Sequence, residues 1–135
     1  MTNEIIRQFF KNYLFIREQG FDAFTREQSK LFSPKLVTLV SDTRGSFIYE
    51  GIDGFFEGMV AWSKHFFVNG QSRHEYIEET PIYVLVRMHG DLKLSEPIKG
   101  ETFSKEGDHD WTEEFELAND LITKVDIKLF FNQPA

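Results

Sequence analysis

The sequence predicts an α+β fold in which N-terminal helices lie across a curved, mostly antiparallel sheet. Residues 1–67 read as helices interrupted by one short hairpin, whereas residues 72–131 read as continuous strand material. Apolar residues make up 41% of the chain, and 15 of the 135 residues are phenylalanine, which indicates a packed interior with large aromatic walls. Because helices on one face of such a sheet close over the space between them, we expect a pocket there.

Composition limits the class of protein. A length of 135 residues suffices for one core, so we expect a single domain that spans residues 1–135. The net charge of −7 argues against a nucleic-acid partner, because phosphate binding needs clustered Lys and Arg. The absence of cysteine excludes disulfides and suits the cytoplasm. The sequence shows no secretory signal and no apolar stretch of the ~20 residues that span a membrane, so we expect no membrane partner.

The first two helices are predicted from apolar spacing and capping residues. The first helix is indicated by a stripe at three- and four-residue intervals, formed by Ile5, Ile6, Phe9, Phe10, Tyr13 and Ile16. Thr2 or Asn3 can cap its start, and Gly20 can end it. Asp22 is the expected N-cap of a second, short helix, which Ser33-Pro34 stops.

A hairpin and a third helix follow. Residues 35–42 are rich in β-branched and apolar side chains, residues 41–45 form a turn, and residues 46–49 return as a second strand. After Gly51 a new apolar stripe predicts a third helix that ends at Asn69-Gly70.

The second half is predicted to hold four strands. The first runs from Arg73 to Met88 and bends near Pro81, since proline cannot donate to a central ladder. Turns are expected at residues 89–91, 106–108 and 118–120, which separates three more strands with the ranges 92–105, 109–117 and 121–131.

Alternation along these strands predicts which faces are buried. In the 109–117 strand, Trp111, Glu113 and Phe115 share the inward face. The strand that begins at Arg73 carries apolar groups on both faces, with Val84 on one side and Leu85 on the other. We therefore expect one side to meet the helices and the other a second copy of the chain; the alternative is a monomer with a few exposed apolar residues.

Most standard catalytic signatures are absent. The sequence has no glycine-rich phosphate loop, no Gly-x-Ser-x-Gly elbow and no His-Glu-x-x-His. The four histidines lack the close spacing of a metal site. Asp108-His109-Asp110 could hold a divalent ion, but a solvated turn explains these residues better. We predict neither a metal nor a cofactor.

Three polar residues are candidates for chemistry inside an aromatic enclosure, where burial raises the pKa of a carboxyl group. Tyr13 lies on the apolar stripe and could stabilise an oxyanion, or be a core tyrosine bonded to a carbonyl. Asp42 ends the 35–42 strand and could move a proton or simply form the turn. Glu113 lies between Trp111 and Phe115, so it is either buried and functional or wet at an open edge.

Several segments resemble the nuclear transport factor 2-like superfamily, which includes ketosteroid isomerases, SnoaL-like polyketide cyclases and limonene-epoxide hydrolases. The resemblance covers nearly the whole chain. It is carried by Phe10-Lys-Asn-Tyr13 followed by Gly20, by Leu31-Phe-Ser-Pro34, by Tyr49-Glu-Gly-Ile52, and by the segments 111–117 and 121–126.

The resemblance implies a cone: a strongly curved sheet wrapped around the helices, an apolar cavity between them, and a homodimer formed through the sheet. In the ketosteroid isomerases a helix-one tyrosine donates to the substrate oxygen, and Tyr13 matches its spacing before Gly20. Their base is an aspartate three residues before a glycine, as Asp42 is before Gly45. Their second acid corresponds to Glu113, where the residue type differs.

Two functions follow from this reading, and the sequence leaves both open. The first is a cofactor-independent acid-base enzyme of isomerase or cyclase type that acts on an apolar, oxygen-bearing molecule through Asp42, Tyr13 and Glu113. The second is a non-catalytic ligand-binding or dimeric interaction module of the same fold. In either case we expect the ligand to contact a set of aromatic side chains, namely Phe10, Phe56, Trp62, Trp111 and Phe115.

Overall fold

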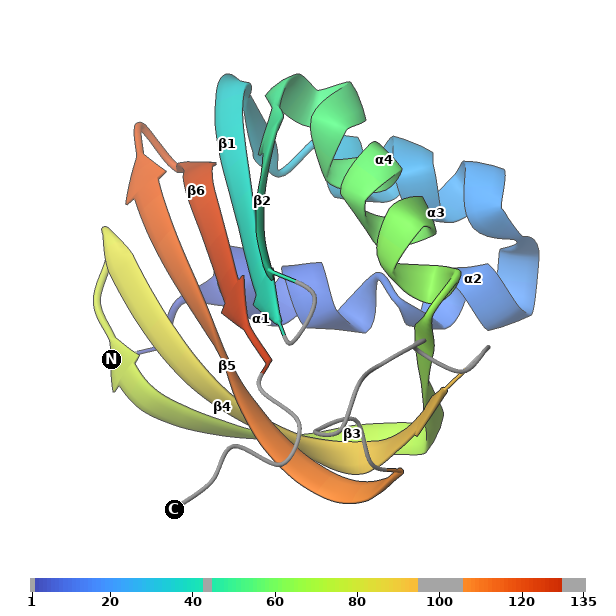
Figure 1. Ribbon diagram of the computed structural model, residues 1–135. Helices are drawn as coiled ribbons and strands as arrows, with labels where there is room; N and C mark the ends of the chain where they lie inside the picture. The colour runs from blue at the N-terminus through green and yellow to red at the C-terminus, as the bar shows by residue number, and fades with distance from the viewer. Residues whose placement is uncertain (1, 43–44, 95–105, 130–135) are drawn as a thin grey trace.

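The computed structural model describes residues 2–42, 45–94 and 106–129, which form helices packed on one six-stranded sheet (Figure 1). The helices are α1 (Glu4–Lys11), α2 (Leu14–Gln19), α3 (Phe21–Ser29) and α4 (Gly51–Ser63). The strands are β1 (Phe32–Asp42), β2 (Gly45–Glu50), β3 (Phe66–Glu79), β4 (Tyr83–Leu94), β5 (Gly107–Ala118) and β6 (Leu121–Lys128).

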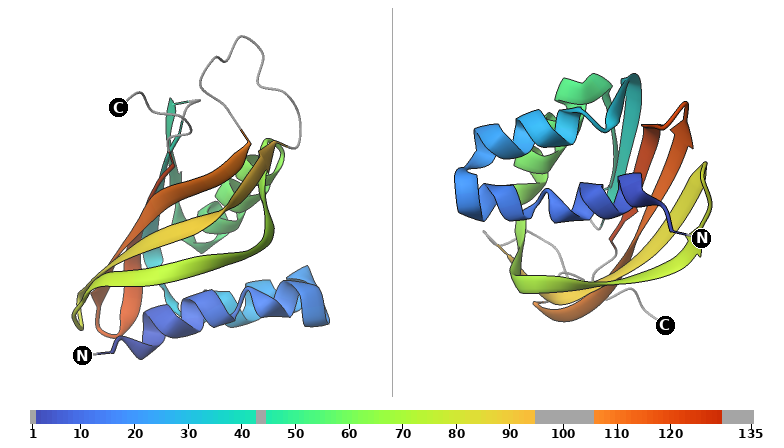
Figure 2. Two further views of the ribbon diagram at one scale, coloured as in Figure 1. Left: turned by 90° about the horizontal axis from the view of Figure 1, so that it is seen from below. Right: turned by 180° about the vertical axis from the view of Figure 1, so that it is seen from behind.

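The sheet is mostly antiparallel and strongly curved. Its strand order is β2-β1-β6-β5-β4-β3, and among these neighbours β1 and β6 run parallel while the other pairs are antiparallel. Helix α1 runs across the hollow side of the sheet, and α4 lies beside β1 and β2 (Figure 1, Figure 2). The predicted α+β roll is confirmed. None of the helices within the described ranges is long and apolar enough to cross a membrane.

The predicted first helix is two helices. Helix α1 ends at Lys11 and α2 starts at Leu14, with Asn12 and Tyr13 in a turn between them. Gly20, with a φ of 96°, separates α2 from α3, which only glycine does without strain. Asn3 caps α1, because its side chain accepts a hydrogen bond from the Ile6 N–H at 3.1 Å.

Two predicted boundaries in this region are wrong. Asp22 is not an N-cap, because α3 starts at Phe21 and places Asp22 in its first turn. Ser33-Pro34 does not lie between a helix and a later strand, since β1 already starts at Phe32. Pro34 is exposed, where its missing N–H leaves no gap in a central ladder. The hairpin itself is confirmed, with Asp42 opposite Gly45 in the register of β1 and β2.

The predicted end of the third helix and the first long strand are also wrong. Helix α4 ends at Ser63, and Phe66 already pairs with Leu94 in the sheet. The predicted 73–88 strand is divided between β3 and β4, which form an antiparallel pair. Pro81 lies in the turn between them, where the Thr80 hydroxyl accepts a hydrogen bond from the Tyr83 N–H at 2.9 Å.

The remaining strand predictions have mixed outcomes. Residues 89–91 lie inside β4 and form no turn, and β5 begins at Gly107, within the predicted 106–108 turn. The predicted 92–105 strand is seen as far as Leu94, and the rest of that range lies outside the described residues, as do residues 130–131. The 118–120 turn is confirmed: Asn119 and Asp120 have φ angles of 53° and 61°, as a two-residue hairpin turn of type I′ requires.

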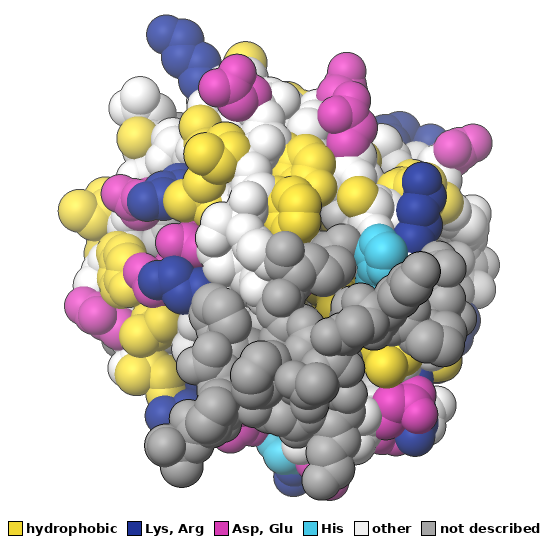
Figure 3. All heavy atoms as spheres, in the orientation of Figure 1, with side chains coloured by type: hydrophobic (Ala, Val, Ile, Leu, Met, Phe, Trp, Pro, Cys, Tyr) yellow, Lys and Arg dark blue, Asp and Glu magenta, His cyan; other side chains and the backbone are white. Residues whose placement is uncertain are grey.

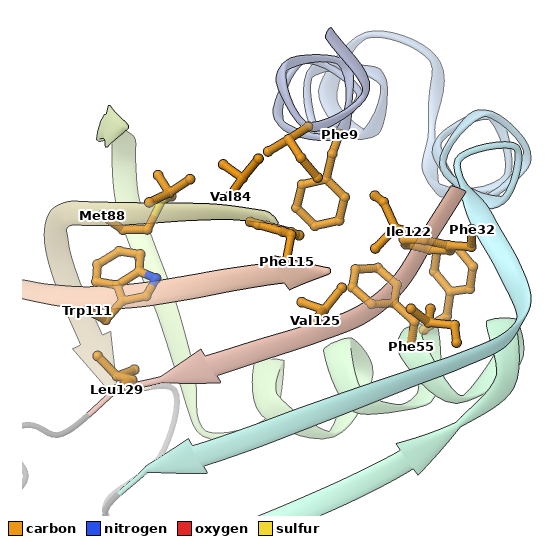
Figure 4. Packing of buried hydrophobic residues seen from close by; sticks show 14 of the residues in the cluster. Phe9, Phe32, Phe55, Val84, Met88, Trp111, Phe115, Ile122, Val125 and Leu129 are labelled. Carbon is orange, nitrogen blue, oxygen red and sulfur yellow. The ribbon is translucent and has the colours of Figure 1, made fainter. Parts of the chain in front are cut away.

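The core is built from phenylalanine rings. Phe9 of α1 contacts Phe115 of β5 at 5.0 Å between ring centroids and Phe55 of α4 at 5.8 Å, while Phe32 and Phe55 lie 4.7 Å apart (Figure 4). Edge-to-face contacts of this kind stabilise beyond the apolar area that they bury. This core fixes α1 and α4 against the sheet, and thereby sets where the polar side chains of the interior can meet.

Candidate functional site

The inward face of β5 carries a buried carboxylate. Trp111, Glu113 and Phe115 alternate with exposed or half-buried residues along the strand, as predicted, and Glu113 is only 7% exposed. In the register it lies opposite Val86 of β4 and Ile127 of β6. Glu113 therefore projects from a strand inside the sheet towards the helices.

Glu113 accepts a hydrogen bond from Trp111 and has a raised pKa. The indole Nε1 of Trp111 donates to its Oε2 at 3.1 Å. Burial raises the pKa of Glu113 from 4.5 to about 7, although the Trp111 hydrogen bond lowers it in part. Desolvation disfavours the charged form of a carboxyl group. Near neutral pH this group can consequently donate or accept a proton.

Tyr13 approaches the same region from the helices. Its ring packs against Phe9 at 5.5 Å and Phe24 at 5.0 Å, and Phe9 in turn contacts Phe115, two residues beyond Glu113. Burial, and then the negative charge of Glu113, raise the pKa of Tyr13 well above 10. The hydroxyl thus lies within the field of the Glu113 carboxylate.

The Tyr13 hydroxyl has no hydrogen-bond partner among the described residues, and the side chain is only partly buried. This geometry differs from that of a core tyrosine bonded to a carbonyl.

Asp42 also lies inside the protein. It ends the inward-facing row of β1 and is only 4% exposed, as expected from the buried positions Leu36, Thr38 and Val40 that precede it by alternation. Strand β6 separates β1 from β5, and Val40 and Glu113 both lie opposite Ile127. Asp42 is two residues further along β1, so two strand spacings and two residues place the backbones at Asp42 and Glu113 roughly 12 Å apart. A molecule between them could reach both carboxylates.

The five aromatic residues that we expected to contact the ligand are buried to different degrees. Phe115 is 0% exposed, and Phe56 and Trp111 are each 8% exposed, so these three belong to the hydrophobic core. Phe10 and Trp62 are partly buried. The ring of Phe10 contacts the His74 ring at 4.3 Å, and that of Trp62 contacts Phe66 at 5.2 Å.

Two further polar atoms lack partners. Thr38 Oγ1 and Trp62 Nε1 are buried and form no hydrogen bond with another described residue. Buried polar groups are nearly always satisfied, so each points to a water molecule or a ligand atom. Sequence reasoning missed Thr38, although its place among the inward positions of β1 was visible in the alternation. It also missed the buried amides Asn12 and Gln28.

The outer face of the sheet has a shallow hollow of about 310 Å³ lined by Arg87, Asp110, Trp111, Thr112 and Lys128. Its cations already have carboxylate partners: Arg87 lies 3.4 Å from Glu75, and Lys128 lies 3.7 Å from Glu114. Tyr13, Asp42 and Glu113 do not line this hollow. Within the described residues, no three His, Asp or Glu side chains gather closely enough to hold a metal ion.

The surface seen in the direction of Figure 1 carries hydrophobic side chains on its upper middle and left parts, with charged side chains among and around them (Figure 3).

Comparison with solved structures identifies the fold. A nuclear transport factor 2-like protein from Burkholderia xenovorans superposes with a TM-score of 0.65 over 94% of this chain and 90% of its own, at 11% identity. The chain has the nuclear transport factor 2-like fold. A proposed SnoaL-like polyketide cyclase from Mesorhizobium loti shares this fold with a TM-score of 0.61 and 13% identity, over 94% of this chain and 98% of its own.

A third neighbour with the nuclear transport factor 2-like fold is a proposed isomerase from Rhodopseudomonas palustris, with a TM-score of 0.65 and 10% identity over 95% of this chain and 90% of its own. No protein-family model matches the sequence, and neither does any curated protein. At these sequence identities the comparisons show a shared fold and nothing more specific.

Proposed function

We propose that this protein binds an apolar small molecule with a carbonyl oxygen, between the helices and the hollow face of the sheet, and moves a proton on the carbon next to that carbonyl. The observation that carries the proposal is the enclosed Glu113 carboxyl, which Trp111 holds on the inward face of β5. Two of the neighbours in fold are a proposed cyclase and a proposed isomerase, and both reaction types can begin with such a proton transfer.

The roles follow from the positions. The Tyr13 hydroxyl and protonated Glu113 donate hydrogen bonds to the carbonyl oxygen, and these bonds strengthen as that oxygen gains charge. Asp42 takes the proton from the neighbouring carbon, which leaves an enolate. In an isomerisation the proton returns to a different carbon of the same molecule. In a cyclisation the enolate carbon attacks a second carbonyl carbon, whose oxygen accepts the proton. No cofactor enters either sequence.

Deuterium exchange tests this proposal without knowledge of the natural substrate. We expect the protein to accelerate the exchange of the α-hydrogens of α-tetralone in heavy water, followed by proton NMR. Asp42→Asn should abolish the acceleration, because the amide is not a base, while Tyr13→Phe should reduce it roughly tenfold through the loss of one hydrogen bond to the developing charge.

The same experiment decides between catalysis and simple binding. If α-tetralone binds but its exchange is not accelerated, the protein is a binding module and the assigned role of Asp42 is wrong. Asp53→Asn is a matched control, since Asp53 lies in the first turn of α4 and has no role in the proposed reaction. It should exchange tetralone hydrogens as fast as the natural protein.

We also propose that the protein acts in the cytoplasm as a single-domain homodimer that pairs through the outer face of the sheet. Ile48 of β2 is 68% exposed and lies opposite Leu39 of β1 on that face, which supplies apolar surface for a second copy. Sedimentation tests this, because a monomer at high micromolar concentration would contradict it.

A further inference from the structure

A chain of three hydrogen-bonded amide side chains, two of them buried, includes the residue next to Tyr13. Gln8 Nε2 donates to Asn12 Oδ1 at 2.7 Å, and Asn12 Nδ2 donates to Gln28 Oε1 at 2.8 Å. Gln28 Nε2 completes the chain by donating to the backbone carbonyl of Phe9 at 3.1 Å. Gln28 is 0% exposed and Asn12 is 1% exposed, so the bonds from Asn12 to Gln28 and from Gln28 to Phe9 form away from bulk water, whereas Gln8 is exposed.

The backbone at this point departs from the α-helical pattern. The Tyr13 N–H donates to the Phe10 carbonyl at 3.3 Å, and the Phe15 N–H donates to the Asn12 carbonyl at 3.0 Å. Both bonds span three residues instead of four, which is a turn of 3₁₀ type. The Phe9 carbonyl consequently loses the N–H of Tyr13, and the side chain of Gln28 takes its place.

The break determines the direction of Tyr13. Each residue advances about 100° around an α-helix and about 120° in a 3₁₀ turn, so a continuous helix would rotate Tyr13 relative to Phe9. Helix α3 supplies both Gln28 and, one turn earlier, the Phe24 ring that packs on Tyr13 at 5.0 Å. Helix α3 therefore contacts both the helix break and the Tyr13 ring.

A continuous helix would satisfy the Phe9 carbonyl without any side chain. Burial of two amide groups is costly unless both are hydrogen-bonded, and apolar residues at both positions would pack without that demand. The amide pair instead stabilises the break between α1 and α2, because a side chain inserted into the hydrogen-bond ladder is a known cause of helix kinks.

We propose that Asn12 and Gln28 are positioning residues that hold the break between α1 and α2 and thereby aim the Tyr13 hydroxyl at the space in front of Glu113. This inference rests on the proposed function, in which Tyr13 and Glu113 bind one oxygen atom. It adds two residues that contact neither ligand nor reacting atoms, and it makes the geometry of the site depend on α3.

Nuclear magnetic resonance of the Tyr13 ring tests the inference without a ligand. With labelled tyrosine, the Tyr13 ring carbon that bears the hydroxyl should shift as Glu113 ionises, because the carboxylate charge acts on the ring through space. Gln28→Met is close in length but cannot donate to the Phe9 carbonyl. We expect it to reduce the amplitude of this titration at least about twofold, as distance weakens the field.

Three further variants complete the experiment. Glu113→Gln should abolish the titration and so prove its origin, and Gln19→Met, at an exposed position of α2, should leave it unchanged. If Gln28→Met fails to fold, Asn12→Ala decides the question: it removes both bonds that Asn12 makes in the amide chain but leaves the bond from Gln28 to the Phe9 carbonyl, and it should reduce the amplitude to a smaller degree.

Full amplitude in folded Gln28→Met, or in Asn12→Ala where only that variant folds, would overturn the inference. A different result would separate the two proposals. If the titration is weakened in these variants, but the natural protein neither binds α-tetralone nor exchanges its hydrogens, the positioning role is upheld and the proposed function is contradicted.

Discussion

Glu113→Gln is expected to stabilise the protein above pH 7, and to leave its stability at pH 4.5 and below nearly unchanged. Burial raises the pKa of Glu113 from 4.5 to about 7, so between these values the native state holds a proton that the unfolded chain has released. The free energy of unfolding of the natural protein therefore falls as pH rises through this window. Each pKa unit is worth ~1.4 kcal/mol, which gives a fall of about 3 kcal/mol.

Urea denaturation at several pH values checks this result. Glutamine carries no charge and can still accept the Trp111 hydrogen bond, so the variant lacks the fall that Glu113 causes. Glu116→Gln is the matched control, because Glu116 lies on the same strand but faces outward beside Lys124. Equal dependence of the unfolding free energy on pH in the natural protein and in Glu113→Gln would show that burial does not raise the pKa of Glu113.

The second large effect is expected from Trp111→Phe, which should raise the pKa of Glu113 above about 7. The indole donates the one hydrogen bond that favours the ionised carboxyl. A hydrogen bond to a charged group contributes ~1.5–3 kcal/mol, so its loss should raise the pKa by at least about one unit. Carbon NMR of labelled glutamate measures the titration directly.

Gly90 supplies a second route to the same effect. A Cβ atom at Gly90 would lie 3.2 Å from Cη2 of Trp111 and 3.1 Å from Cγ1 of Val68, so Gly90→Ala should displace the indole and raise the pKa of Glu113 in the same direction. Trp62→Phe is the control, because Trp62 Nε1 contacts no described hydrogen-bond partner. A pKa that stays near 7 in Trp111→Phe would refute the role given to the indole.

The burial of Glu113 could be predicted from sequence because the pattern that reveals it is local. Alternation along β5 has a period of two, and a carboxylate between Trp111 and Phe115 falls on the inward face whatever the rest of the fold does. The helical period likewise placed Tyr13 on the apolar stripe of the first helix, although it did not give the direction that the turn at Asn12 and Tyr13 imposes. These periodicities depend on neighbouring residues alone.

The break between α1 and α2 could not be predicted, because its cause is distant in sequence. Gln28 lies 16 residues from Asn12, and nothing near Asn12 shows that its amide will be buried. The apolar pattern of the sequence is continuous through this turn, which a side chain of another helix, Gln28, stabilises.

The division of residues 66–94 into two strands was missed for a related reason. Apolar residues continue on both sides of Pro81, so the pattern fits one bent strand as well as a hairpin. The pairing of Phe66 with Leu94 decides between them, and such pairing is a tertiary interaction. It also ends α4 earlier than its apolar stripe suggests.

The central claim is that Tyr13 and Glu113 bind the same ligand oxygen, and the affinity for α-tetralone as a function of pH tests it most directly. A ketone only accepts hydrogen bonds, so protonated Glu113 attracts it and ionised Glu113 repels it. We predict an affinity that falls as pH rises through about 7, that loses this dependence in Glu113→Gln, and that is roughly tenfold weaker in Tyr13→Phe. An affinity independent of pH, or unchanged by the loss of the Tyr13 hydroxyl, would contradict the claim.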